Sequence, residues 1–140
     1  MSRLIIIGSG VKEKADFYGS FEIMTINKEI RRYRGVKHHI SLHDLASGMA
    51  ISHRRKVKHK AMCTWDYKDE GGTSGLFALF VALKLGYDKI ALWGIPLSGT
   101  YGNPAVTGVW KRFIENNDCG NVRSFHGKTK KYLGDAKGWF

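Results

Sequence analysis

The sequence has few cysteines, few prolines and no long apolar run. Its 140 residues include two cysteines, Cys63 and Cys119, whose spacing fits neither a metal motif nor a disulfide framework, so we expect reduced thiols. The apolar stretch at residues 4–7 is too short for a signal-peptide core, and the longest apolar run, residues 76–83, is far shorter than a membrane span. We therefore expect a soluble cytoplasmic protein without a membrane partner.

Negative charge is also scarce. The sequence has 12 Asp and Glu residues and 23 Lys and Arg residues, which gives a net charge of +11. Such an excess favours anionic partners, namely nucleotides, nucleic acid or anionic lipid. Much of it lies at residues 31–60 and 128–137. The same runs are equally explained as solvated faces that keep a small protein soluble.

The pattern of apolar segments predicts an α/β fold. Runs rich in β-branched residues alternate with helical segments, which is typical of a mostly parallel sheet with helices on both faces. The length fits a single Rossmann-like domain over residues 1–140. We expect helices at 74–85 and around 106–114, the second ending by Gly120, and a basic, aromatic tail at 127–140. The expected strands are residues 3–7, 22–27, 38–43, 61–65, 89–95 and 122–125.

Polar residues follow several of these strands. In an open parallel sheet, ligands bind beyond the carboxyl ends of the strands, where strand order reverses. A Gly-x-Gly turn after the first strand can present backbone N–H groups to a phosphate, although a simple tight turn explains it as well. The candidates at this edge are Gly8, Ser9, Gly10, Asn27, His43 with Asp44, residues 71–75, and residues 96–99.

The turn GGTSG at residues 71–75 comes directly before the most apolar segment of the chain. Thr73 or Ser74 can cap the following helix, and the free N–H groups of its first turn form an anion site. Ordinary capping without a ligand fits equally well. The preceding glycines favour a ligand, because they let it approach the backbone, so we assign Thr73, Ser74 and Gly75 to the binding site.

The histidines supply the acid/base candidates. None of the six shows helical metal spacing with acidic partners, so we expect no metal site. His43 and His126 each follow a predicted strand, which makes them candidates for acid/base work or ligand contact. A non-catalytic polar role is the alternative for both.

The segment TSGLFALFVALKLGYDKIALWGI at residues 73–95 resembles the turn, long helix and strand of bacterial sialyltransferases and of proteins similar to 6-hydroxymethylpterin diphosphokinase. In those families the turn matching Gly8-Ser9-Gly10 and the strand end matching Asn27 contact the nucleotide. The chain is more similar to small bacteriophage and prophage proteins, through ISLH at 40–43, GGTSGL at 71–76, LWGIP at 92–96 and VRSFHGKTKKYLG at 122–134. Because this chain has no room for the sialyltransferase lid, the resemblance implies nucleotide binding more than glycosyl transfer.

These observations predict a phage-type protein that binds a nucleotide or a nucleotide-linked small molecule, such as a nucleotide sugar, without a further cofactor. It would be a transferase, a phosphate-bond hydrolase or a nucleotide-sequestering protein. The alternative is a nucleic-acid-associated or virion protein without catalysis, and the sequence leaves a homo-oligomer open. That alternative would use the tail lysines together with Arg31, Arg32, Arg34, Arg54, Arg55, Lys56 and Lys58.

Overall fold

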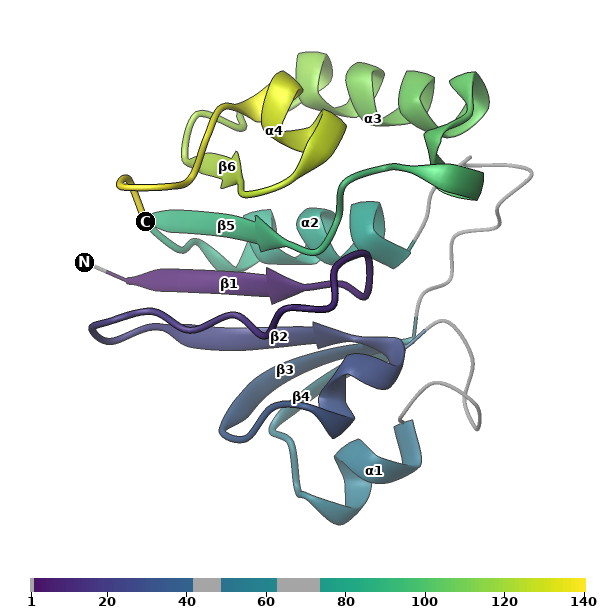
Figure 1. Ribbon diagram of the computed structural model, residues 1–140. Coiled ribbons are helices and arrows are strands. Elements are labelled where there is room, and N and C mark those ends of the chain that lie inside the picture. The colour runs from purple at the N-terminus through teal and green to yellow at the C-terminus, as the bar shows by residue number, and fades with distance from the viewer. Residues whose placement is uncertain (1, 42–48, 63–73) are drawn as a thin grey trace.

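A computed structural model describes residues 2–41, 49–62 and 74–140. They form one six-stranded sheet in the order β4-β3-β2-β1-β5-β6, in which every neighbouring pair is parallel (Figure 1). The predicted α/β fold with a parallel sheet is confirmed. The strands are β1 Arg3–Ile7, β2 Glu22–Ile26, β3 Val36–Ser41, β4 His59–Met62, β5 Lys89–Trp93 and β6 Val122–Ser124.

The order in which the chain adds strands to the sheet reverses once. The chain adds β2, β3 and β4 on one side of β1, then crosses back through α2 to place β5 on the other side. The point where strand order reverses therefore lies between β1 and β5, at their carboxyl ends. The helices are η1 Asn27–Arg31, α1 Met49–Arg54, α2 Ser74–Leu85, η2 Gly99–Gly102, α3 Pro104–Asn116 and α4 Gly127–Leu133, where η marks a 3-10 helix.

The two faces of the sheet are covered differently. Because side chains alternate along a strand, Leu4 and Ile6 of β1 pack under α2 and α3, while Ile5 and Ile7 face the other side. That second side is covered by an aromatic cluster and, near β4, by η1 and α1 (Figure 1). The connection from β1 to β2 contains no helix, so it differs from the usual first crossover of a doubly wound fold. The cluster includes Phe17, Phe21, Trp93, Phe125 and Phe140.

The basic, aromatic tail packs on its own chain. After α4, the Ser124 N–H donates to the Gly134 carbonyl and the Ala136 N–H donates to the Ser124 carbonyl, both over 3.0 Å, so the tail extends the sheet beyond β6. The ring centroid of Trp139 then lies 5.0 Å from Lys89 Nζ and 4.9 Å from the central carbon of the Arg123 guanidinium, so the ring contacts two cations. The tail therefore covers the short edge strand β6.

The predicted strand ends differ from the structure where the backbone turns. β2 ends before Asn27, whose φ is 52°, and β5 ends before Gly94, whose φ is 71°. The expected strand ends at 42–43 and 63–65 lie outside the described residues, whereas α2 and β1 have the predicted bounds. No helix in the described part of the chain combines the length and apolarity that a membrane crossing needs.

Candidate functional site

The loops after β1 and β5 are bonded directly to each other. The Gly8 N–H donates to the Trp93 carbonyl over 2.8 Å, and the Gly10 N–H donates to the Gly94 carbonyl over 2.7 Å. Two of the backbone donors that the sequence assigned to a phosphate are therefore already used. Since residues 11–21 form no helix, the turn does not lead into the N-terminus of a helix, as it would in a dinucleotide-binding turn. At the point of strand reversal, the loops after β1 and β5 are therefore in direct contact with each other.

The loops after β5 and β6 also interlock. The Lys128 N–H donates to the Pro96 carbonyl over 2.9 Å. Gly127 has a φ of 61°, and a Cβ there would lie 2.4 Å from the Pro96 carbonyl oxygen. Only glycine fits this contact, because the neighbouring atoms belong to the backbone.

Two buried hydroxyls fasten α4 to the end of β5. Thr129 Oγ1 donates to the Ile95 carbonyl over 2.6 Å, and the Ser124 and Thr129 hydroxyl oxygens are 2.7 Å apart. Since Thr129 has one hydroxyl proton and gives it to Ile95, the Ser124 hydroxyl donates to Thr129. Both side chains are fully buried, so each hydrogen bond replaces one that water would otherwise supply.

We expect the substitution Thr129→Val to lower the free energy of unfolding by about 1 to 3 kcal/mol, because it leaves the Ile95 carbonyl and the Ser124 hydroxyl buried without this partner. Thr129→Ser is the matched control: it keeps the hydroxyl and loses one methyl group, at a cost of about 0.8 kcal/mol. Urea unfolding measures both. Equal stability of the two variants would contradict the proposed hydroxyl chain.

His126 is held by the same loops. The Gly94 N–H donates to His126 Nδ1 over 3.1 Å, which requires that this nitrogen carries no proton. Burial lowers the pKa of His126, and Lys130 lowers it further, while Glu13 opposes them. The ring is therefore neutral with its proton on Nε2. In this state His126 can donate a hydrogen bond, but it is not prepared to accept a proton as a general base.

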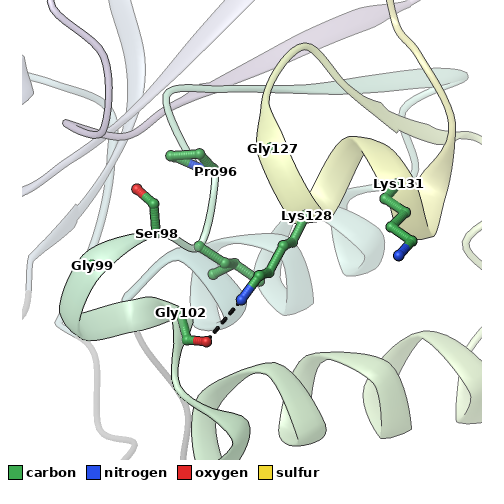
Figure 2. Close-up of a pocket in the computed structure, with 8 residues that line it drawn as sticks. Pro96, Ser98, Gly99, Gly102, Gly127, Lys128 and Lys131 are labelled. Carbon is green, nitrogen blue, oxygen red and sulfur yellow. Dashed lines mark hydrogen bonds between the residues drawn. The ribbon is translucent and has the colours of Figure 1, made fainter.

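An open pocket lies one strand further along, between the segment 96–102 and the start of α4 (Figure 2). Its volume is about 560 Å³. Lys128 Nζ donates to the Gly102 carbonyl over 2.8 Å, which fixes its position at the pocket wall. The lining contains two lysines and no acidic residue. It consists of Pro96, Leu97, Ser98, Gly99, Gly102, Gly127, Lys128 and Lys131.

The pocket wall contains a strained residue. Leu97 has a φ of 55°, in the left-handed region that bulky side chains rarely adopt, yet its side chain is buried in the core. Such a conformation costs on the order of 1–3 kcal/mol and is found most often at binding and active sites. Burial of the leucine side chain offsets this cost and sets the path of the next residues, Ser98 and Gly99.

The other residues of the predicted site do not line this pocket. Ser9 is exposed after β1, Asn27 turns the chain at the end of β2, and Ser74 and Gly75 are buried at the start of α2. His43 and Thr73, with Asp44 and residues 71–72, lie outside the described residues. The structure thus brings together Gly8, Gly10 and His126 around Gly94, and none of these four residues lines the pocket.

Sequence reasoning included residues 96–99 of the pocket but missed Gly102, Gly127, Lys128 and Lys131. A signal was present: Gly127-Lys128-Thr129 follows β6 and forms the first turn of α4, like the second half of a phosphate-binding P-loop. The first glycine of that motif is absent, because residue 122 is valine, and the Thr129 hydroxyl is used on Ile95. The segment is therefore not a P-loop, although it places a lysine at the same kind of strand end.

Among the described residues, no group of three or more His, Cys, Asp or Glu side chains could hold a metal ion. Comparison with known proteins gives no relative: no family model, curated protein or solved structure matches the chain significantly. The interpretation of the site therefore depends on its own geometry.

Proposed function

We propose that the protein binds a nucleotide or a nucleotide-linked small molecule in the pocket at the carboxyl ends of β5 and β6. The observation that carries this proposal is the composition of the pocket wall, which has two ammonium groups, a serine hydroxyl and no carboxylate. Two cations without a neighbouring carboxylate in the wall favour an anionic ligand. Its position fits the general rule that ligands of parallel sheets bind beyond the carboxyl ends of the strands.

The polar groups suit a phosphate. Lys128 spends one of its three N–H donors on Gly102, so two remain for ligand oxygens. Within the described part of the chain, neither the Ser98 hydroxyl nor the Lys131 ammonium has a hydrogen-bond partner. The volume of about 560 Å³ lies in the usual range of small-molecule sites, roughly 300–1,000 Å³.

An exposed aromatic residue lies next to the pocket residues in the sequence. Tyr101 is 54% exposed, between the pocket residues Gly99 and Gly102. An exposed ring at this place offers a stacking surface for a nucleobase. In this arrangement the lysines hold the phosphate and Tyr101 contacts the base.

The geometry favours binding over catalysis. A transferase or hydrolase of this type needs a base, and the hydrogen bond from Gly94 occupies the nitrogen through which His126 would accept a proton. His126 could donate from Nε2 to a ligand oxygen instead. His43, the other acid/base candidate of the sequence, lies outside the described residues.

A thermal-shift panel of nucleoside triphosphates, nucleotide sugars and inorganic phosphate tests the proposal. At 100 times its dissociation constant, a ligand that binds only the folded state adds roughly 2.7 kcal/mol to stability. We expect a stabilising nucleotide, and an affinity at least tenfold lower in Lys128→Gln/Lys131→Gln, because each lost charge-assisted hydrogen bond is worth about 1.5–3 kcal/mol.

The matched control is Lys84→Gln/Lys137→Gln, which removes the same charge from exposed positions outside the pocket. It should bind like the wild type. If the two double variants lose affinity equally, the nucleotide responds to net charge alone and the pocket is not its site.

A further inference from the structure

The basic run at residues 31–60 forms, together with Lys28, a surface of its own at the β4 end of the sheet. η1 and α1 lie side by side there, although about twenty residues separate them in the chain (Figure 1). The pocket lysines belong to α4, next to β6 at the opposite end of the sheet. The structure thus divides the cations that the sequence had assigned together to nucleic acid.

Charge on this surface has one sign. The described residues 27–37 and 49–60 contain a single acidic residue, Glu29, which is buried and paired with Arg32 over 3.2 Å. Burial, the largest influence, raises the pKa of Glu29, and the nearby cations Arg32 and Lys28 lower it in part. The only carboxylate of these segments is therefore not available to neutralise the exposed cations. The same segments contain ten basic residues: Lys28, Arg31, Arg32, Arg34, Lys37, Arg54, Arg55, Lys56, Lys58 and Lys60.

Some of these cations build the surface and others remain for a partner. Arg55 Nη1 donates to the carbonyls of Ile30 and Tyr33, so it ties α1 to η1, and Lys60 Nζ donates to the Val57 carbonyl. Arg32 and Lys37 are paired with glutamates. The remaining six are exposed, and their side chains make no hydrogen bond or ion pair with the described residues. We call these six the η1–α1 basic surface: Lys28, Arg31, Arg34, Arg54, Lys56 and Lys58.

We propose that the η1–α1 basic surface binds the phosphate backbone of double-stranded nucleic acid without sequence preference. Six unpaired cations on a rigid frame repel one another, and an array of phosphates relieves that repulsion. The described residues of this surface include no exposed Phe, Tyr or Trp on which single-stranded bases could stack. Residues 27–37 and 51–60 likewise offer no exposed large apolar side chain for insertion into a lipid surface.

The salt dependence of binding to a duplex of about 20 base pairs tests this proposal, since each neutralised duplex phosphate contributes about 0.9 to the slope of log affinity against log salt. If three to five of the six cations engage, the slope is roughly −2.7 to −4.5, and affinity falls by roughly 40- to 500-fold between about 50 and 200 mM salt. A slope near zero, or no binding in dilute buffer, would overturn the proposal.

The variant Arg31→Gln/Arg54→Gln should make the slope less negative by about 1.8, with the same effect on duplexes of unrelated sequence. Arg112→Gln/Lys130→Gln removes two exposed charges near the other end of the sheet and should leave the slope unchanged. Equal loss in both double variants would mean a net-charge effect and would overturn the assignment to η1 and α1. Both replace exposed side chains, and thermal melts of each verify that it is folded.

Two further measurements distinguish a nucleic acid from a lipid as the source of the phosphates, and this surface from the pocket. Vesicles containing phosphatidylserine should bind more weakly than the duplex at the same salt, and preferential binding to vesicles would replace nucleic acid by a membrane as the partner. Lys128→Gln/Lys131→Gln should keep duplex binding, while Arg31→Gln/Arg54→Gln should keep nucleotide binding. Loss of one activity without the other distinguishes failure of this proposal from failure of the pocket.

Discussion

The substitution Gly94→Ala is expected to lower the free energy of unfolding by about 3–5 kcal/mol, one of the largest effects available to a single methyl group. Gly94 has a φ of 71°, and a Cβ there would lie 2.3 Å from the Gly8 carbonyl oxygen. The obstruction is backbone, so it cannot rotate away. Relief would require separation of the loops after β1 and β5, with loss of the hydrogen bond from Gly10 to Gly94.

Gly86→Ala is the matched control for Gly94→Ala. Gly86 has a similar φ of 77°, but a Cβ there meets no atom within 4 Å. Alanine at this position should lower the free energy of unfolding by about 1–2 kcal/mol, because only the left-handed backbone conformation is unfavourable for it. Urea unfolding of both variants separates backbone strain from steric overlap. If the two cost the same, the close contact between the loops after β1 and β5 is not what fixes the strand ends.

Acidification from pH 7 to 4 should cost the protein about 3 kcal/mol through one side chain, His38. This residue is 3% exposed, and its Nε2 lies 2.7 Å from the Tyr87 hydroxyl, which in turn donates to Glu22. Burial lowers the pKa of His38 from 6.5 to about 4, with further lowering by His59 and Lys37 and opposition from Glu22. One pKa unit corresponds to 1.36 kcal/mol, so the lowering amounts to about 3 kcal/mol.

The sign follows from proton binding. Between about pH 4 and 6.5 the unfolded chain holds a proton on this histidine and the folded protein does not, so stability decreases as pH falls through that window. His126 acts in the same direction because burial lowers its pKa, whereas Glu29 acts in the opposite one because burial raises its pKa. Urea unfolding at several pH values, compared between wild type and His38→Gln, isolates the contribution. A His38 ring that titrates near pH 6.5 by NMR would contradict the prediction.

Local patterns predicted the regular elements well. β1 and α2 have the expected bounds because each is a continuous apolar run closed by glycine, and both are buried by their neighbours. α4 was not anticipated, since a seven-residue helix with three lysines, Lys128, Lys130 and Lys131, has little periodicity. Its position depends on the buried bond from Thr129 to Ile95, a contact between residues 34 apart in the chain that no local pattern predicts.

The site was predicted less well than the fold, for the same reason. The residues Gly8-Ser9-Gly10 show that a tight turn follows β1, but they cannot show that Trp93 and Gly94 take the hydrogen bonds of Gly8 and Gly10. Such partners are set by the strand order, in which β5 lies beside β1. The ends of β1, β2, β5 and β6 could therefore be located from sequence to within about two residues, while the groups left available for a ligand could not.

The most direct test of nucleotide binding at the β5 and β6 strand ends is a two-dimensional ¹⁵N–¹H NMR titration with the nucleotide that gives the largest thermal shift. We expect saturable shifts of the amides of Ser98, Gly99, Gly102, Gly127 and Lys128, and none for the η1–α1 basic surface. Saturation without any change at these five amides would contradict nucleotide binding in the pocket.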